Sequence, residues 1–329
     1  MTIRRIRLTS IAFFLPLLAS CASAGVRTGV VPREGFIASA DGVRLYYRVA
    51  GSGPDTIVVI NGGPGVGHEV LAPDVAPLEA RHTVVFYDQR GGGRSGLPDT
   101  TMLGMDRFVE DLDAVRRHLG MERMSLLAHS YGPLIAASYA RAHPERVERM
   151  IFFGGLGPRR EDAIAFSRAR TAQRDSAQER RWQDIARRMR AGTVAEVVDA
   201  CRENTALMNE LVAAEGWPVR RGTSCYAPAE AVLYGSRYTS RMLSRSLGEY
   251  DFTRDLAGLR APILVITGDR DETPVPAHRS WAAAVPDGRL LLIPGGGHYP
   301  HIERPDVFYP AVDAFMADGW PADAVDPTP

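Results

Sequence analysis

One short segment puts a serine where a nucleophile could form. Residues 124–132 read Met-Ser-Leu-Leu-Ala-His-Ser-Tyr-Gly, an apolar run that ends at Ser130. The pattern is close to Gly-x-Ser-x-Gly, in which small residues on either side allow a sharp turn from a strand into a helix. Ala128 stands in place of the first glycine. Such a turn exposes the hydroxyl for attack on a carbonyl carbon, whereas the alternative for this fragment alone is a strand followed by a helix that Ser130 caps.

A serine nucleophile requires a base and a carboxylate, and both follow it along the chain. Residues 261–268 have the pattern of a buried strand and lead into Asp269 and Asp271, and a second apolar run leads through three glycines into His298. The order serine, acid, histidine is that of a Ser-Asp-His triad. We therefore predict Ser130 as the nucleophile and His298 as the general base and then acid. Asp271 would orient His298, with Asp269 as the alternative acid.

Three further segments extend the pattern. Residues 61–65 read Asn-Gly-Gly-Pro-Gly, residues 88–95 read Asp-Gln-Arg-Gly-Gly-Gly-Arg-Ser, and residues 297–305 follow the predicted histidine. Together they resemble the α/β-hydrolase superfamily, and within it the proline iminopeptidase group of serine aminopeptidases, whose first loop has histidine in place of Asn61. The resemblance covers roughly residues 35–156 and 256–318.

This resemblance implies further site residues. The backbone N–H groups of Gly63 and Tyr131 would form the oxyanion hole. Aminopeptidases of the group bind the free amino terminus through acidic residues of a cap domain, and Glu230 is the candidate here, with Glu203 a weaker one. The alternative for Glu230 is an ordinary exposed helix residue.

The leading function is therefore a proline iminopeptidase-like serine hydrolase that releases amino-terminal residues, proline preferred, from short peptides. A carboxylesterase or lactonase that acts on small esters with the same triad is the alternative. A catalytically inactive binding module is a third possibility, against which the intact triad argues.

The elements that would position these residues follow from apolar periodicity. A hairpin over 36–49 turns at Asp41-Gly42, and strand and helix patterns alternate after it, which predicts an α/β fold with a mostly parallel sheet flanked by helices. Strands are expected at 56–61, 83–88, 123–128 and 147–154, and helices near 69–79, 105–119 and 131–143.

The chain divides accordingly. Helical patterns replace strand patterns after residue 156, which predicts an inserted helical cap. The expected parts are a signal peptide at 1–21, a linker at 22–34, the two parts of the α/β-hydrolase core at 35–156 and 256–320, the cap at 157–255 and a proline-rich, disordered tail at 321–329.

Composition excludes several classes of function. The formal net charge is zero, so nothing indicates a nucleic-acid partner. All 39 basic residues are arginine, and without lysine a Ser-Lys dyad, a Schiff base and a P-loop are excluded. The eight histidines form no metal-binding motif, and His301, three residues after His298, is expected to be a structural neighbour. We expect no metal or cofactor, and a small molecule or short peptide as substrate.

The amino terminus has the pattern of an export signal. Three arginines in residues 4–7 precede an apolar stretch over 11–19 that is too short to span a bilayer. Residues 18–21, Leu-Ala-Ser-Cys, resemble a lipobox, which predicts acylation of Cys21 and an envelope protein anchored by lipid on the periplasmic face of the outer membrane. The alternative is cleavage after Ala24, which would give a soluble periplasmic or secreted protein. The oligomeric state is left open.

Export would also permit a disulfide. Cys201 and Cys225 both lie in the predicted cap and could pair in an oxidising compartment, or remain two buried thiols. The cap also contains ten arginines and five acidic residues over 159–190. We interpret this excess as a solvated helix face, with contact to anionic lipid as the alternative.

Overall fold

The structure, a computed structural model, describes residues 33–327. Its centre is an eight-stranded sheet with the order β1-β2-β4-β3-β5-β6-β7-β8. β2 pairs antiparallel with both β1 and β4, and all other neighbours are parallel. The predicted mostly parallel α/β sheet is therefore confirmed. The strands are β1 (Glu34–Ala38), β2 (Arg44–Ala50), β3 (Thr56–Ile60), β4 (Thr83–Tyr87), β5 (Met124–His129), β6 (Val147–Phe153), β7 (Ile263–Gly268) and β8 (Gly288–Ile293).

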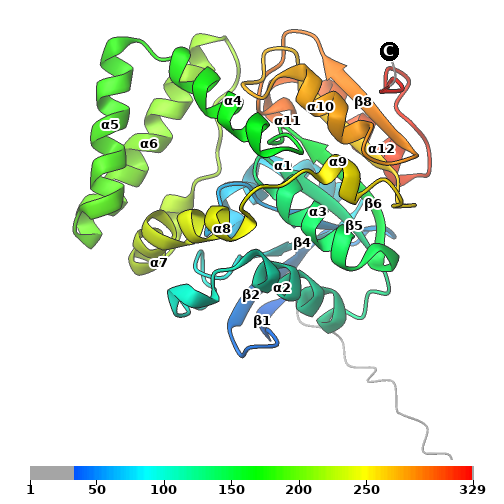
Figure 1. The fold of residues 1–329 in the computed structure, drawn as a ribbon, viewed down its shortest axis with the longest axis horizontal. Coiled ribbons are helices and arrows are strands. Elements are labelled where there is room, and N and C mark those ends of the chain that lie inside the picture. The colour runs from blue at the N-terminus through cyan, green and yellow to red at the C-terminus, as the bar shows by residue number, and fades with distance from the viewer. Residues whose placement is uncertain (1–32, 328–329) are drawn as a thin grey trace, which may run out of the picture. The chain divides into compact units, whose positions relative to one another are not determined.

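Helices cover both faces of this sheet (Figure 1). Because side chains alternate along a strand, Val58 and Ile60 join one apolar core and Ile57 and Val59 the other. The first core includes side chains of α2 (Met105–His118), α3 (Gly132–Ala142), α9 (Phe252–Asp255) and α10 (Val275–Ala282). The second includes side chains of α1 (Ala72–Val75) and α12 (Pro305–Met316). The central strands β5 and β7 are buried along their whole length, as parallel strands covered on both faces must be.

Short helical turns complete the connections. The helix expected near 69–79 is a series of such turns around α1. The four-residue α11 (Pro300–Glu303) precedes α12. The 3₁₀ turns are His68–Val70, Ala76–Ala80, Thr100–Met102, Pro144–Arg146 and Ser224–Tyr226.

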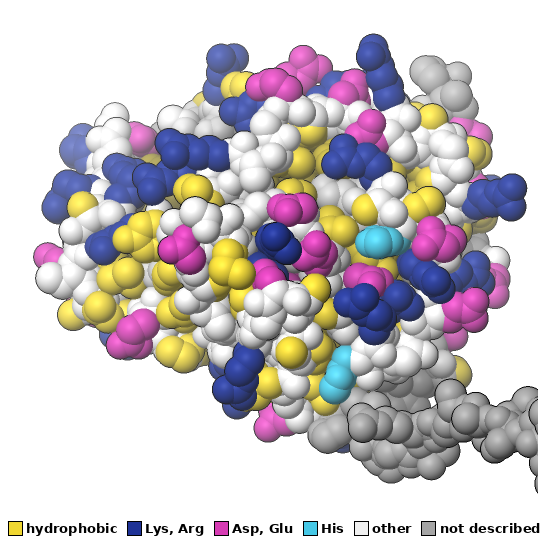
Figure 2. Space-filling model, turned by 60° about the horizontal axis from the view of Figure 1, so that its bottom comes forward, with side chains coloured by type: hydrophobic (Ala, Val, Ile, Leu, Met, Phe, Trp, Pro, Cys, Tyr) yellow, Lys and Arg dark blue, Asp and Glu magenta, His cyan; other side chains and the backbone are white. Residues whose placement is uncertain are grey.

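Five helices form the insertion between β6 and α9, at the left of Figure 1. A π-helical turn, Gly235–Thr239, joins the last two. Many arginines of the insertion pair with acidic residues, as Arg181 does with Glu210 and Arg188 with Asp184. Figure 2 shows basic side chains gathered over this end of the molecule. The helices are α4 (Arg160–Ala172), α5 (Ser176–Ala191), α6 (Val194–Ala214), α7 (Ala229–Tyr234) and α8 (Ser240–Leu247).

A disulfide closes a loop within the insertion. Cys201 on α6 is bonded to Cys225, 24 residues later, with 5.8 Å between the Cα atoms. On the chain-entropy argument, a loop of this length contributes about 3.5 kcal/mol to the free energy of unfolding. The bond therefore fixes the segment 215–225 against α6.

The tail is ordered over 321–327, which corrects the expectation of disorder there. Val325 and Leu290 of β8 exchange two backbone hydrogen bonds of 2.9 and 3.0 Å, and Ala324 is buried in the second core. The predicted signal peptide and Cys21 lie outside the described residues. Within 33–327 no helix has the length and apolar character that crossing a membrane requires.

Candidate active site

Ser130 lies in a strained turn at the carboxyl end of β5. Its φ of 57° is in the left-handed region, which is costly for a residue with a side chain, and α3 begins two residues later at Gly132. A Cβ atom at position 132 would lie 2.5 Å from the carbonyl oxygen of Ile60, so the helix can approach β3 this closely only with glycine. Ala128, which replaces the usual glycine, is completely buried. The turn has the geometry that the sequence pattern predicts.

A histidine and a carboxylate continue from this serine in one hydrogen-bonded chain. His298 Nε2 lies 3.1 Å from Ser130 Oγ, and His298 Nδ1 lies 3.0 Å from Asp271 Oδ1. Asp271 follows β7 and His298 follows β8, so neighbouring parallel strands bring the two loops together. The structure thus brings together the three residues that the sequence selected.

The side chain of Asp271 is buried and accepts several hydrogen bonds. It accepts hydrogen bonds from the Thr267 hydroxyl at 2.9 Å and from the Thr273 amide at 2.9 Å, and His278 Nε2 lies 3.3 Å away. Burial alone would raise the pKa of this carboxyl group, but the positive charge of His298 and the hydrogen bonds from His278 and His298 hold it below the usual range. Asp271 therefore stays ionised beside His298.

The alternative acid, Asp269, points elsewhere. Its side chain is exposed and accepts a hydrogen bond from the Gly295 amide at 2.8 Å. Asp269 thus stabilises the loop after β8 through Gly295 and makes no hydrogen bond to His298. Geometry thus favours Asp271 over Asp269.

The Asp271 carboxylate also changes the basicity of His298. Burial lowers the pKa of an imidazole, but the charge of Asp271 and its hydrogen bond raise the pKa of His298 to about 9. Glu272 adds to this effect, since its Oε2 lies 3.9 Å from His298 Nδ1.

The predicted oxyanion loop packs directly on the serine. A Cβ atom at position 62 would lie 2.4 Å from the Ser130 Cβ, so only glycine fits there, and Gly63 lines the same cavity as Ser130. Asn61 donates to the Gly67 carbonyl at 3.1 Å, and Gln89 donates to the Asn61 carbonyl at 3.0 Å. These bonds explain how the loop is held with asparagine at position 61.

Residues of the segment 88–95 have structural roles. Arg90 is completely buried and forms ion pairs with Asp41 of the hairpin turn at 2.8 Å and with Asp111 of α2 at 2.6 Å. Asp88 accepts hydrogen bonds from the backbone amides of His68 and Arg94. The segment therefore supports the oxyanion loop and the hairpin and does not itself reach the serine.

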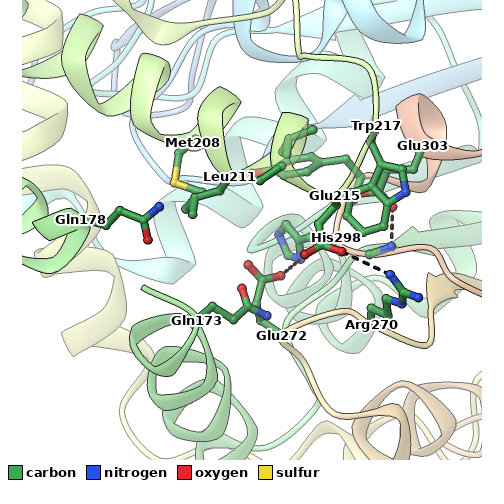
Figure 3. Close-up of a pocket in the computed structure, with 14 residues that line it drawn as sticks. Gln173, Gln178, Met208, Leu211, Glu215, Trp217, Arg270, Glu272, His298 and Glu303 are labelled. Atoms are coloured by element: carbon green, nitrogen blue, oxygen red, sulfur yellow. Dashed lines mark hydrogen bonds and ion pairs between the residues drawn. The ribbon is translucent and has the colours of Figure 1, made fainter. Parts of the chain in front are cut away.

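Two cavities lie beside Ser130 and His298, and both contain Met208 and Tyr299. The first, the Ser130 cavity, has a volume of about 210 Å³. The second, the His298 cavity, has a volume of about 400 Å³. Figure 3 shows the second, with Glu272 directed at His298 and Glu215 paired with Arg270. The insertion helices supply part of the wall of both.

The predicted cap carboxylates are not in these walls. Glu230 is exposed in the first turn of α7 and lines neither cavity. Glu203 forms an ion pair with Arg188 and also lies outside both linings. The role of Glu230 in binding a free amino terminus stays a prediction, since the structure places its side chain outside the linings of both cavities.

His301 is buried within an aromatic cluster, with ring centroids 5.1 Å from Phe153 and 5.6 Å from His129. Burial, together with the charges of Arg220 and His298, lowers the pKa of His301 to about 3, so the ring is neutral. It also lines the Ser130 cavity, which the expectation of a purely structural neighbour did not include.

Two clusters group possible metal ligands within 4.8 Å of one another in the described residues. In each cluster the histidine is already hydrogen-bonded to the aspartate: His68 Nδ1 lies 2.8 Å from Asp88, and His298 Nδ1 lies 3.0 Å from Asp271. We therefore assign the clusters to internal hydrogen bonding. They are His68, Glu69 and Asp88, and Asp271, Glu272 and His298.

Comparison with known proteins places this geometry in a family. The alpha/beta hydrolase fold family matches residues 55–305, and the chain belongs to it. A proline iminopeptidase of Heyndrickxia coagulans is 26% identical over 309 residues, which are 86% of this chain and 98% of the relative. The protein is therefore a hydrolase whose specificity these relatives leave open.

Solved structures show the same fold. A proline iminopeptidase of Mycobacterium smegmatis superposes with a TM-score of 0.61 at 24% identity, over 87% of this chain and 98% of that one. An esterase of Rhodococcus sp. ECU1013 superposes with a TM-score of 0.61 at 20% identity, over 87% and 99%. Peptidases and esterases thus share this architecture.

The raised pKa of His298 predicts a pH dependence. Only neutral His298 can take the proton from Ser130, so kcat/KM should increase with pH through a midpoint near 9 instead of the ordinary 6.5. Hydrolysis of p-nitrophenyl acetate from about pH 6 to about pH 10, with the rate of a Ser130→Ala control subtracted, measures it. A plateau already complete at about pH 7 would contradict the assigned effect of Asp271.

Proposed function

We propose that the protein is a serine hydrolase that forms an acyl-enzyme on Ser130. The Ser130 oxygen attacks the carbonyl carbon while His298 Nε2 accepts its proton. His298 then gives that proton to the leaving group, and the bond between carbonyl carbon and leaving group breaks. Water, activated by His298 in the same way, releases the acid and restores Ser130. Asp271 keeps the Nδ1 proton of His298 in place throughout.

The negative charge that develops on the carbonyl oxygen of the substrate must be stabilised by hydrogen-bond donors. The backbone N–H groups of Tyr131 and Gly63 are proposed for this role, because Tyr131 opens α3 next to the nucleophile and Gly63 lines the cavity above it. Backbone donors held by packing need little reorganisation during the reaction.

The observation that carries this proposal is the unbroken hydrogen-bonded chain from Ser130 to Asp271. Replacing Ser130 by alanine removes the nucleophile, and kcat should fall by about 10⁶-fold while the thermal unfolding transition is retained. A fluorophosphonate probe should label the wild-type protein at Ser130 and leave the variant unlabelled. Turnover or labelling of Ser130→Ala near the wild-type level would refute the assignment.

For the substrate we propose short peptides with a free amino terminus. The relatives named proline iminopeptidase support this choice, as does the His298 cavity, whose lining contains three glutamates and one arginine. Glu303 accepts hydrogen bonds from the amides of Gly297 and Tyr299, and Glu215 pairs with Arg270 at 3.2 Å. Within residues 33–327, the ion pairs of Glu272 are contacts of 3.9 Å, to Arg170 and His298, so it is the carboxylate available to an ammonium group.

A small ester or lactone is the second candidate. The position of Glu230 favours it, because the carboxylate expected to recognise an amino terminus lies outside both cavities. The same triad cleaves esters without needing a protonated leaving amine.

A substitution of Glu272 distinguishes the peptide substrate from the ester substrate. If it binds the substrate ammonium, Glu272→Gln should lower the ratio of kcat/KM for Pro-p-nitroanilide to that for p-nitrophenyl acetate by about 10- to 150-fold, the value of a charge-assisted hydrogen bond. The exposed Glu230→Gln is the matched control and should leave the ratio unchanged. An unchanged ratio in Glu272→Gln, with acetyl-Pro-p-nitroanilide cleaved as fast as the free amine, would favour the esterase.

We also propose export and attachment to the envelope through Cys21. The Cys201–Cys225 disulfide supports an oxidising compartment, where such bonds persist.

A further inference from the structure

The Ser130 cavity is lined by two arginines from the insertion, Arg170 of α4 and Arg220 of the segment after α6. Among the described residues that line it, Asp74 is the one acid. Its oxygens accept hydrogen bonds from the amides of Arg221 at 2.9 Å and Gly222 at 3.1 Å. The Asp74 carboxylate also lies 3.4 Å from the guanidinium group of Arg221, so its charge already has a partner, and the two arginines that line the cavity leave an excess of positive charge there.

Arg220 has no carboxylate partner within residues 33–327. Its guanidinium group donates to the Tyr299 hydroxyl at 3.0 Å and to the Gly222 carbonyl at 3.3 Å, and it lies 4.9 Å from the centre of the Tyr299 ring. A half-buried cation with neutral partners only is costly unless a ligand supplies the counter-charge. Arg170, by contrast, lies 3.9 Å from Glu272 and is partly neutralised.

The charge of Arg220 changes the pKa of Tyr299, which also lines the cavity. Burial raises the pKa of Tyr299, yet Arg220 and then Arg170 lower it below the ordinary value. A site that stabilises a phenolate in this way also favours a bound anion.

The cavity wall also contains polar atoms that the protein leaves unpaired. Asn204 Oδ1 and both ring nitrogens of the buried His301 have no hydrogen-bond partner within the described chain. Because buried polar atoms are nearly always paired, these atoms indicate a polar ligand or water in the cavity.

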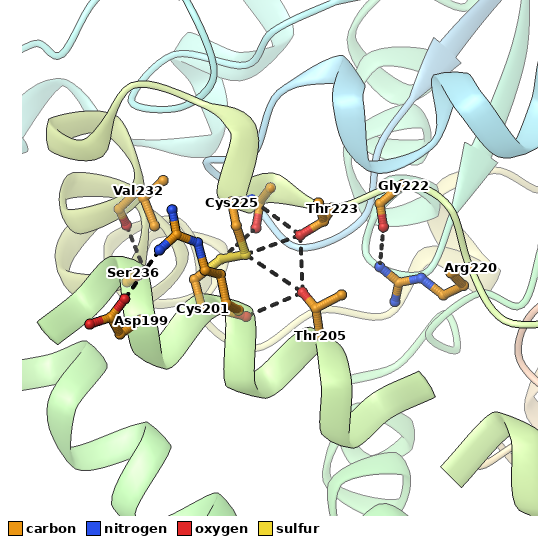
Figure 4. Close-up of a disulfide and its surroundings, with 11 residues drawn as sticks. Asp199, Cys201, Thr205, Arg220, Gly222, Thr223, Cys225, Val232 and Ser236 are labelled. Atoms are coloured by element: carbon orange, nitrogen blue, oxygen red, sulfur yellow. Dashed lines mark hydrogen bonds and ion pairs between the residues drawn. A yellow bond between two sulfur atoms is a disulfide. The ribbon is translucent and has the colours of Figure 1, made fainter. Parts of the chain in front are cut away.

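The disulfide holds the two sides of this wall together (Figure 4). Cys201 lies one helical turn before Asn204 and Thr205, and Cys225 follows Arg220 by five residues. Thr205 Oγ1 lies 3.0 Å from Thr223 Oγ1, which adds a second link. The guanidinium group of Arg220 is therefore held in position before a ligand arrives.

We propose that the Ser130 cavity binds a carboxylate group of the substrate through Arg220, so that the enzyme selects acyl compounds that carry a second, anionic end. A guanidinium group offers two parallel N–H donors that match a carboxylate. The carboxylate is the carboxyl terminus of a short peptide or the free acid of a half-ester. This inference rests on the proposed attack by Ser130.

Matched substrate pairs test it. Mono-p-nitrophenyl adipate is compared with its methyl ester, and Pro-Ala with Pro-Ala-amide, in each case as the ratio of kcat/KM for the compound with a free carboxylate to the compound without one. The wild-type ratio should be about 10 to 150 in at least one pair, the range for a charge-assisted hydrogen bond. A preference in the ester pair alone identifies a half-ester, and one in the peptide pair alone identifies a peptide carboxyl terminus.

Arg220→Met removes the charge but keeps much of the length of the side chain, and should reduce that ratio to about one. Arg220→Lys keeps the charge without the planar donors and should retain part of it. Arg202 is an exposed residue of α6 that pairs with Asp199. The variant Arg202→Met is therefore the control and should keep the wild-type ratio. Fluorophosphonate labelling of Ser130 reports that each variant is folded.

Two results would overturn the inference. One is a wild-type ratio near one in both pairs, with Ser130 labelled and the compounds without a carboxylate hydrolysed, which would leave the proposed serine mechanism intact. The other is an equal loss of kcat/KM in Arg220→Met for compounds with and without a free carboxylate. Failure of the wild-type protein to label or to hydrolyse any of the four compounds would remove the serine mechanism and this inference together.

Discussion

The pairing of buried, ionised Asp271 with His298 is the interaction on which the site depends. A carboxylate without exposure to water needs several donors, and the hydroxyl of Thr267, the amide of Thr273 and His298 supply them. That arrangement requires the loops after β7 and β8 to touch. A Cβ atom at Gly268 would lie 1.9 Å from the backbone of Gly296, so glycine is needed where the loops meet. The parallel sheet and Gly268 therefore hold the loop that carries His298 in place before substrate binds.

The two cavities beside Ser130 and His298 differ in the charged side chains that line them. Glutamates line the cavity beside His298, while arginines from the insertion line the one beside Ser130. The loops that follow the sheet strands carry Ser130, Asp271, His298 and Glu272, whereas the insertion contributes Arg170 and Arg220. This division agrees with a fold whose solved relatives include both a peptidase and an esterase.

The sequence predicted the sheet and the three central residues because each has a local signal. Ser130 lies in a strand-to-helix turn, and Asp271 and His298 each follow an apolar run at the same edge of the sheet. The insertion offered no such signal: helical periodicity located α7 but did not show that Glu230 faces solvent. Arg220 lies between helices, and Glu272 was overlooked beside Asp271, since charge and spacing alone do not report which side chains meet across a cavity. Likewise, the proline-rich tail pairs with β8 through Val325, a contact that composition cannot predict.

Exchange of each candidate acid for its amide tests the central claim most directly. Asp271→Asn should lower kcat by about 10⁴-fold, because the amide no longer favours the histidine tautomer that accepts the Ser130 proton. Asp269→Asn removes the charge of an exposed side chain that hydrogen-bonds only the Gly295 amide, and should change kcat less than about tenfold. The reverse ranking would assign the acid to Asp269 and contradict the role of Asp271 as the partner of His298.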